Sequence, residues 1–304
     1  MNLYIKCSSR PFYLERLLRS IEMNCRGVGK LILLNDGIPA PRIARLAQGR
    51  PHLEERRSPR LVAGGAPDPG RFWAREVGAE GRRLVMVLEE DTWLVAPIDL
   101  DAVERVLLEN QAIMMRMFWH GAAELTAAAA IQYSAQAADG FTIDFYGKVD
   151  AKRFVDRYNY FCVAHGIFRA DYYSQTMLGT AHWADEVHLL QAAVSFINTA
   201  VARGEKFRFA KSREEMFRHS SATTSRADSG GLGVAPLDAR AVNEALNQAW
   251  ENGELDVMAG YPGDIAEDVL AAQIGRRLGA AALDQWRRWR EDYLRIYEDF
   301  GAKL

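Results

Sequence analysis

Three short strand-like segments, each followed by polar or turn-forming residues, constrain the fold of this chain more than any other feature of its sequence. They span residues 3–7, 30–34 and 84–88. The first contains Lys6, whereas the second after Lys30 and the whole of the third are unbroken apolar runs, which are typical of parallel strands that are buried on both faces of a sheet. Between the first two segments, apolar residues recur at the i, i+3, i+4 and i+7 spacing of a helix: Leu14, Leu17, Leu18 and Ile21. A strand, a helix and a strand at this spacing predict a βαβ unit with a right-handed crossover and a parallel sheet.

The rest of the pattern extends this α/β architecture. Helices are predicted near residues 42–48, 72–81, 99–110, 171–177 and 185–202, and further strands at 112–118, 161–168 and 207–209. Ser9 is a suitable N-cap for the first helix, with Pro11 in its first turn. A Ser/Thr/Gly-rich stretch at 220–233 reads as a linker, and the chain beyond it is predicted to be helical. We therefore expect an α/β domain at 1–222 and a helical region at 234–304.

Composition excludes several functional classes. The 304 residues carry a formal net charge of −2, so no basic excess predicts binding to nucleic acid. The three cysteines lie far apart without a CxxC pair, which argues against a zinc ribbon and fits a reducing compartment. The chain enters a strand directly after Met1, and no stretch approaches the roughly 20 apolar residues needed to span a bilayer. We expect a soluble cytoplasmic protein.

Polar residues follow two of these strand-like segments. Asn35, Asp36 and Gly37 follow the second segment, and the acids Glu89, Glu90 and Asp91 follow the third. The carboxyl ends of parallel strands are where α/β sheets bind their ligands. Carboxylates are also the ligands that Mg²⁺ prefers. Alternatively, an Asp-Gly pair and a group of acids form ordinary solvated turns.

Four landmarks, in this order, resemble glycosyltransferases of the family-2 type with a GT-A fold. Residues 9–18 are similar to the family's T-x-x-R-P-x-x-L-x-R-x-L opening, and residues 34–37 to its V-D-D-G turn, with Asn35 replacing the first aspartate. Residues 74–78 are close to A-R-N-x-G, and residues 88–91 to L-D-D-D, which carries the metal-binding DXD motif. A weaker fifth match, at 183–189, is similar to W-x-E-D-x-x-L. The resemblance covers about residues 1–220.

The resemblance implies a GT-A fold, which is a Rossmann-like, mostly parallel central sheet flanked by helices, here with a C-terminal helical extension. It implies a metal-dependent glycosyltransferase of the hexosyltransferase type. The donor would be a UDP- or GDP-sugar, and the acceptor a glycan, a lipid-linked molecule or a protein. Residues 1–222 would then be the catalytic domain that binds the nucleotide-sugar.

The resemblance also implies roles for individual residues. Asp91 is the first candidate ligand for Mn²⁺ or Mg²⁺, with Glu89 and His219 as further candidates. Six residues are candidates for binding the donor: Ser8, Ser9, Arg10, Asp36, Arg75 and Glu90. An inverting transfer needs a carboxylate base, and the weaker fifth match offers Asp185 and Glu186. The two acids are swapped relative to the common order, so either could be the base. An acidic first turn favoured by the helix dipole is the alternative for this pair.

Other readings remain open. Asn35 and Glu89 depart from the family pattern, which keeps a catalytically inactive protein that binds carbohydrate or nucleotide as the alternative. A nucleotidyltransferase is less favoured, because residues 8–14 lack a Gly-rich phosphate loop. The arginines of the C-terminal helices could rest on an anionic membrane. They could instead form a solvated face opposite an aromatic stripe that packs on the catalytic domain, and a homodimer contact there is a third possibility.

Overall fold

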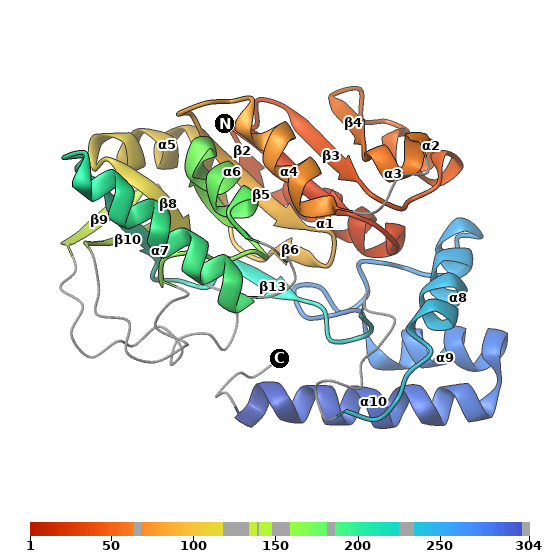
Figure 1. Cartoon of the computed structure of the whole chain (residues 1–304). Helices are drawn as coiled ribbons and strands as arrows, with labels where there is room; N and C mark the ends of the chain where they lie inside the picture. Colours follow the sequence, from red (N-terminus) through yellow and green to blue (C-terminus); the bar gives the residue numbers. More distant parts are fainter. Residues whose placement is uncertain are drawn as a thin grey trace.

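The computed structural model has a central sheet with helices around it (Figure 1). The structure describes residues 1–63, 68–117, 134–138, 140–147, 159–180, 186–224 and 234–299. Among these residues the sheet has nine strands in the order β4-β3-β1-β5-β11-β8-β12-β10-β9. β1 (Asn2–Cys7), β3 (Leu31–Asn35), β4 (Leu53–Arg57) and β5 (Leu84–Glu89) are parallel neighbours. β11 (Gly166–Arg169) runs antiparallel between β5 and β8 (Ala112–Arg116). β12 (Arg208–Ser212) is parallel to β8, and β10 (Phe141–Tyr146) and β9 (Ser134–Ala138) complete the sheet as antiparallel strands.

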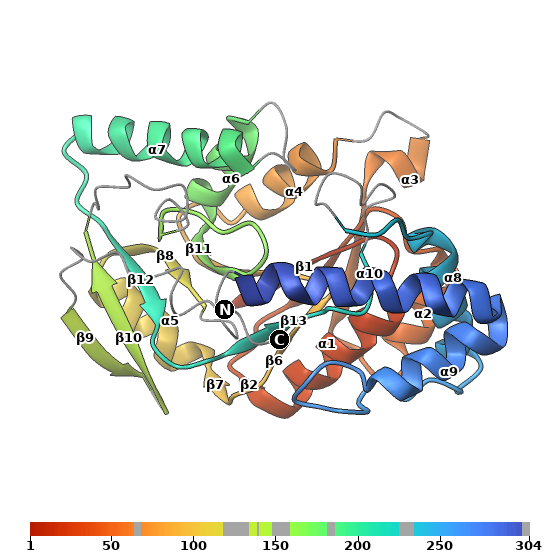
Figure 2. The same cartoon turned by 90° about the horizontal axis from the view of Figure 1, so that it is seen from below.

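Helices cover both faces of the sheet, as Figure 2 shows. One face packs on α1 (Pro11–Asn24), α2 (Ala40–Ala47) and α5 (Leu100–Glu109). The other packs on α4 (Pro69–Gly78), α6 (Ala170–Leu178) and α7 (Glu186–Ala202). Within β1, Leu3 and Ile5 belong to the first apolar cluster and Tyr4 to the second. The alternation of side chains along a strand therefore explains why these apolar runs have no polar face.

Shorter elements connect these layers. α3 (Pro59–Ala63) follows β4. β2 (Cys25–Arg26) pairs with β7 (Ile98–Asp99), which leads into α5. β6 (Thr92–Leu94) pairs with β13 (Phe217–His219), so the segment after β12 returns to the acids that follow β5.

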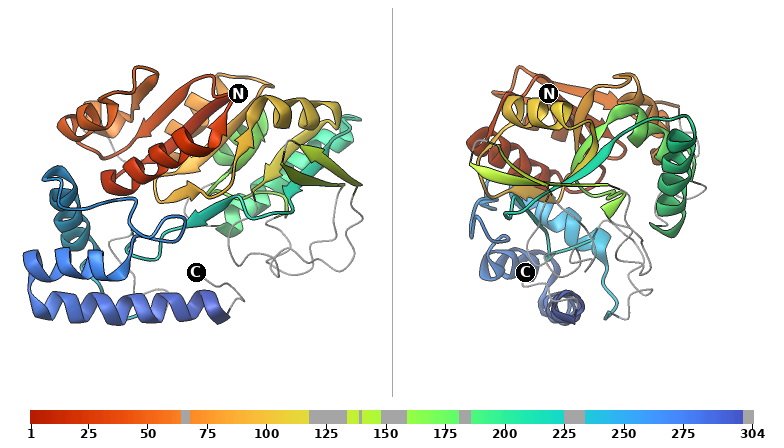
Figure 3. Two further views of the ribbon diagram at one scale, coloured as in Figure 1. Left: turned by 180° about the vertical axis from the view of Figure 1, so that it is seen from behind. Right: turned by 90° about the vertical axis from the view of Figure 1, so that its left-hand side faces the viewer.

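The C-terminal helices are α8 (Ala239–Glu251), α9 (Glu267–Leu278) and α10 (Ala280–Asp299). They gather on one side of the sheet and are coloured blue in Figure 3. Trp286 and Trp289 of α10 are fully buried in the same apolar cluster as α1 and β1. The Trp286 indole N–H also donates to the carbonyl of Ala222 at 2.7 Å. These two tryptophans of the last helix are thus part of the core.

The fold class predicted from the sequence is confirmed: a mostly parallel central sheet is flanked by helices, with a helical C-terminus. Three details differ. β4 was not predicted because its sequence, LEERR, is highly charged, as edge strands often are. The strand predicted at 161–168 is shorter, at Gly166–Arg169. The N-cap of α1 is Arg10 rather than Ser9, and no side chain caps that end.

No helix in the described ranges is long and apolar enough to cross a membrane. Arginines of the C-terminal helices are partly paired. Arg276 and Arg277 each lie 2.9 Å from Glu254, and Arg290 lies 2.7 Å from Glu267. These ion pairs neutralise part of the basic face for which a membrane contact was one of the alternatives.

Candidate functional site

The carboxyl ends of β3, β1 and β5 meet at one edge of the sheet and bring most of the predicted site residues together. In the register of the sheet, Cys7 lies opposite Asn35, and Lys6 lies opposite Glu89. The turn at 8–10, the turn at 36–37 and the acids at 89–91 therefore follow three adjacent strands. Adjacent parallel strands end at the same edge, which is where ligands bind in such sheets.

Glu90 is buried and organises the turn between β1 and α1. Its carboxylate accepts hydrogen bonds from the backbone N–H of Ser8 at 2.8 Å and of Ser9 at 3.3 Å. The same carboxylate accepts from Nε of Arg10 at 3.0 Å. These three donors occupy Glu90 within the protein, so it positions the turn on which the predicted donor-binding residues lie.

Asp91 is also buried, and one of its oxygens contacts both Arg10 and His219. Nη1 of Arg10 lies 2.8 Å from its Oδ2, and Nε2 of His219 lies 3.2 Å from the same oxygen. The other oxygen, Oδ1, is buried and has no hydrogen-bond partner within the described part of the chain. A buried carboxylate oxygen without a partner is unusual and suggests a ligand.

His219 reaches Asp91 through strand pairing. β13 pairs with β6 so that His219 lies opposite Thr92, and the backbone N–H of Ser220 donates to the Asp91 carbonyl at 2.9 Å. Burial alone would raise the pKa of Asp91, but the charges of Arg10 and then of His219 hold that pKa well below its usual range. Burial lowers the pKa of His219, yet Asp91 more than offsets this effect and raises that pKa. The site therefore favours an ionised Asp91.

Glu89 has a different partner from the other two acids. Nζ of Lys6 lies 2.8 Å from Oε1 of Glu89 and also donates to the carbonyl of Val163. The Lys6 ammonium lies 5.1 Å from the centre of the Trp73 ring. Among the residues that the structure describes, no group of three or more His, Cys, Asp or Glu side chains is arranged to hold a metal ion. The three predicted ligands are therefore divided between the Asp91–His219 contact and the Lys6–Glu89 pair.

Asp36 and its neighbours form the turn after β3. Asp36 is buried, and its backbone N–H donates to the Cys7 carbonyl at 2.8 Å. Oδ1 of Asn35 accepts from the backbone N–H of Gly37 at 3.0 Å and of Ile38 at 2.8 Å. A Cβ on Gly37 would lie 2.3 Å from the Ser8 carbonyl oxygen, so only glycine fits there. Asn35 thus holds a turn that packs directly against the β1–α1 turn.

Other predicted residues do not join this cluster. The Arg75 side chain is 67% exposed, and it pairs with its neighbour Glu76 at 3.3 Å. Asp185 lies outside the described residues, as does the side chain of Glu186 at the start of α7. Ser9 lies in the cluster, where its hydroxyl oxygen is buried without a partner within the described ranges.

Two contributions to the site were missed by sequence reasoning. Lys6 is the one charged residue of β1, and its role depends on the register that places it beside Glu89. The C-terminal helices also reach the site, because the Asn247 side chain donates to the Ser9 carbonyl at 3.0 Å. No local signal in the sequence marks a contact between residues so far apart.

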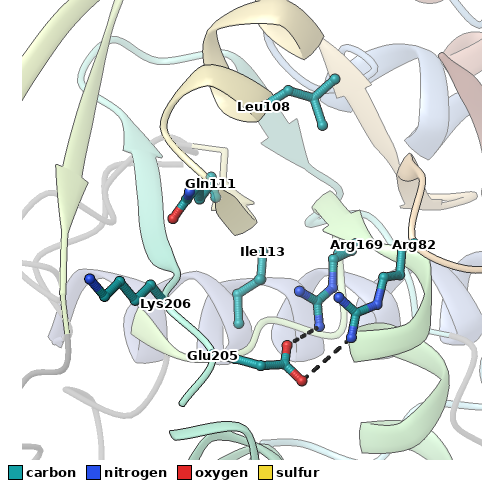
Figure 4. Close-up of a pocket in the computed structure, with 8 residues that line it drawn as sticks. Arg82, Leu108, Gln111, Ile113, Arg169, Glu205 and Lys206 are labelled. Atoms are coloured by element: carbon teal, nitrogen blue, oxygen red, sulfur yellow. Dashed lines mark hydrogen bonds and ion pairs between the residues drawn. The ribbon is translucent and has the colours of Figure 1, made fainter. Parts of the chain in front are cut away.

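A separate hollow of about 330 Å³ lies at the opposite edge of the sheet, near the starts of β8 and β12 (Figure 4). Glu205 there lies 3.4 Å from Arg82 and 3.6 Å from Arg169. Lys206 and Ile113 also line the hollow, and none of the predicted site residues does.

Comparisons with known proteins find similarity in structure alone. No protein-family model matches the chain, and no curated protein matches its sequence. Glucosyl-3-phosphoglycerate synthase from Mycobacterium tuberculosis, in complex with Mn²⁺, UDP and glucosyl-3-phosphoglycerate, is 12% identical with a TM-score of 0.41, over 65% of this chain and 65% of that chain. TarS 1-349 from S. aureus is 10% identical with a TM-score of 0.44, over 98% of this chain and 90% of that chain. UTP-bound UGPase from Acinetobacter baumannii is 12% identical with a TM-score of 0.41, over 72% of this chain and 86% of that chain.

Glycosyltransferase structures are thus among those that this fold resembles. The chain spans 65% of the length of the first of them.

Proposed function

We propose that this chain is a glycosyltransferase that transfers a sugar from a UDP- or GDP-sugar to a glycan, lipid-linked or protein acceptor. The observation that carries the proposal is the cluster of buried Arg10, Glu90 and Asp91 with the half-buried His219, in which Oδ1 of Asp91 has no hydrogen-bond partner among the residues that the structure describes. A nucleoside diphosphate gains negative charge as it leaves the sugar. A preorganised site with fixed cationic groups stabilises that charge.

Asp91 and His219 are the proposed ligands of a divalent cation, Mn²⁺ or Mg²⁺. Such cations often take only one or two ligands from the protein. The unpartnered Asp91 oxygen fits this role. When bound, the cation would supply positive charge to the leaving diphosphate. Glu89 was the third candidate, but we leave it out of the ligand set because Lys6 holds its carboxylate.

The other predicted site residues are proposed to bind the donor or to act as the base. Ser8, Ser9 and Arg10 would face the phosphates from the β1–α1 turn, and Asp36 would accept a hydrogen bond from the nucleotide base. Glu90 would hold that turn in place. Two roles stay predictions: that Arg75 contacts the donor, and that Asp185 or Glu186 is the base of an inverting transfer. The division into a catalytic domain at 1–222 and a helical region at 234–304 is likewise a proposal.

Donor turnover and thermal stabilisation test the proposal together. We expect UDP or GDP with Mn²⁺ to raise the melting temperature, and the matching nucleotide-sugar to be cleaved. Asp91→Asn should lower turnover about 100-fold or more, because it removes the charge of a proposed ligand of the cation that would stabilise the leaving diphosphate. Asp284→Asn, which alters an exposed aspartate on α10, is the matched control and should leave turnover unchanged.

The outcomes separate the alternatives. If no nucleotide-sugar is bound or cleaved and Asp91→Asn changes nothing, the proposal is wrong. Stabilisation by a nucleoside diphosphate with Mn²⁺, without turnover on any acceptor, would instead favour an inactive protein that binds nucleotide or carbohydrate.

A further inference from the structure

Arg10 contacts the carboxylate that is the first proposed ligand of the cation. Its guanidinium contacts two acids at once, Glu90 through Nε at 3.0 Å and Asp91 through Nη1 at 2.8 Å. The side chain of Arg10 is 6% exposed, so water screens its charge poorly. Arginine keeps its charge throughout the accessible pH range, so this interaction is permanent in the free protein.

The charges of the cluster are already close to balance without a metal. Lys6 neutralises Glu89, and Arg10 offsets one of the two charges on Glu90 and Asp91. His219 contacts the same Asp91 oxygen as Arg10 at 3.2 Å. A divalent cation at Asp91 would therefore add two positive charges beside a buried guanidinium, in a region where repulsion is strong. A diphosphate would bring the negative charge that removes this imbalance.

We infer that Arg10 makes metal binding at Asp91 and His219 depend on the nucleoside diphosphate. In the free protein, Arg10 weakens the affinity of the two ligands for the cation. When the diphosphate is present, phosphate oxygens give the guanidinium an alternative partner of the kind that arginine binds well. Metal and nucleotide then enter as a coupled pair. This inference rests on the proposed function, because it assumes that a diphosphate binds at this edge of the sheet.

Metal binding can be measured without any reaction, by following the electron paramagnetic resonance signal of free Mn²⁺ during titration. We expect the wild-type protein to bind Mn²⁺ about tenfold tighter or more when UDP or GDP is present, a coupling of ordinary size. By reciprocity, Mn²⁺ should tighten the binding of the same nucleotide by the same factor.

Substitutions at Arg10 separate charge from shape. Arg10→Gln should bind Mn²⁺ alone about tenfold tighter than the wild type. UDP or GDP should then increase the Mn²⁺ affinity of this variant less than it does in the wild type, because most of the coupling between metal and nucleotide is lost. Arg10→Lys keeps the charge and should behave like the wild type. Asp91→Asn should remove binding in every arm. Arg50→Gln is the matched control, because Arg50 is also a partly buried arginine paired with two acids, Glu15 and Glu22, away from Asp91.

Two results would overturn the inference. One is a wild-type Mn²⁺ affinity that neither UDP nor GDP changes, and this needs no variant that could fail to fold. The other is an Arg10→Gln protein with a near wild-type melting temperature that binds Mn²⁺ alone no tighter than the wild type. If either occurs while nucleotide-sugar is still cleaved, the inference fails and the proposed function stands. If neither diphosphate binds with or without Mn²⁺, the proposed function fails and the inference falls with it.

Discussion

At the scale of single residues, three consecutive acids acquire three different roles from their partners. Glu89 pairs with Lys6, Glu90 holds three donors of the β1–α1 turn, and Asp91 contacts Arg10 and His219. The sequence predicted that these acids end a buried strand, and that prediction is confirmed. The sequence could not predict which partner each acid contacts, because the partners lie on other elements and one of the partners, Lys6, lies within a buried strand.

Glu90 is predicted to be the most important of the three acids for stability. Glu90→Ala leaves the N–H groups of Ser8 and Ser9 and the guanidinium of Arg10 without their acceptor. Removing one partner of a buried ion pair costs about 3–5 kcal/mol. We expect that loss in the free energy of unfolding measured with urea. Glu109→Ala, at an exposed position of α5, is the control and should change this free energy by about 0.5 kcal/mol or less.

His165 predicts a pH dependence of stability. It is buried against the ring of Phe217 at 5.1 Å, and its Nε2 lies 3.3 Å from the Met117 carbonyl. Burial, followed by the charge of Arg116, lowers the pKa of His165 to about 3. The unfolded chain takes up a proton at this histidine below its ordinary pKa of about 6.5, whereas the folded protein does not. The contribution to stability is therefore present above pH 6.5 or so and is lost as the pH falls towards 3.

The measurement compares wild type with His165→Asn between pH 6.5 and pH 5, where most carboxylates are still ionised. We expect the free energy of unfolding of the wild type to fall more steeply, by about 1.4 kcal/mol per pH unit at most. Equal slopes in the two proteins would show that His165 takes up its proton equally in the folded and unfolded states.

At the scale of elements, the parallel half of the sheet could be predicted and the pairing around it could not. β3 and β5 are visible in the sequence because strands buried on both faces carry few polar residues, and β1 is visible because Lys6 is the one charge within it. β4 was not predicted because it carries charges along an edge, and β11 was predicted with its start five residues too early. β13 consists of Phe217, Arg218 and His219, and only its pairing with β6 explains why His219 reaches Asp91. Long-range pairing leaves no periodic signal in the sequence.

Arg16 of α1 is predicted to stabilise the packing of residues 257–264, which precede α9, against α1. Its guanidinium donates to the carbonyls of Val257 and Gly263 and lies 4.4 Å from the centre of the Trp93 ring. Arg16→Leu should leave the buried carbonyl of Val257 and the partly buried carbonyl of Gly263 without their donor, at about 1–3 kcal/mol for the buried one and less for the other. We expect faster amide hydrogen exchange in residues 257–264, together with a lower free energy of unfolding. Arg19→Leu, on the exposed side of the same helix, should leave exchange in that segment unchanged.

At the scale of the whole molecule, the C-terminal helices and the sheet share one apolar core. Trp286 of α10, Leu246 of α8 and Leu14 of α1 belong to the same buried cluster. Arg42 of α2 lies 2.7 Å from Glu244 and 2.8 Å from Glu251 of α8, and Asn247 of α8 bonds to the turn that holds Arg10. The composition of the predicted linker suggested that residues 1–222 and 234–304 are two parts. The sequence alone could not show that the apolar faces of these two parts meet in one core. The shared core instead predicts that the two parts unfold together.

Trp286→Ala tests this cooperativity. The indole is fully buried and donates to the Ala222 carbonyl, so its removal should cost about 3–5 kcal/mol. If α10 and the sheet form one cooperative unit, differential scanning calorimetry should show a single transition that moves to lower temperature as a whole, with equal calorimetric and van't Hoff enthalpies. Arg287→Ala, at the exposed neighbouring position, should leave the transition in place. Two transitions, of which only one moves, would instead mean that the helical region unfolds as a separate unit. The hydrogen bond from Asn247 to the Ser9 carbonyl would then break when the helical region unfolds, while the sheet stays folded.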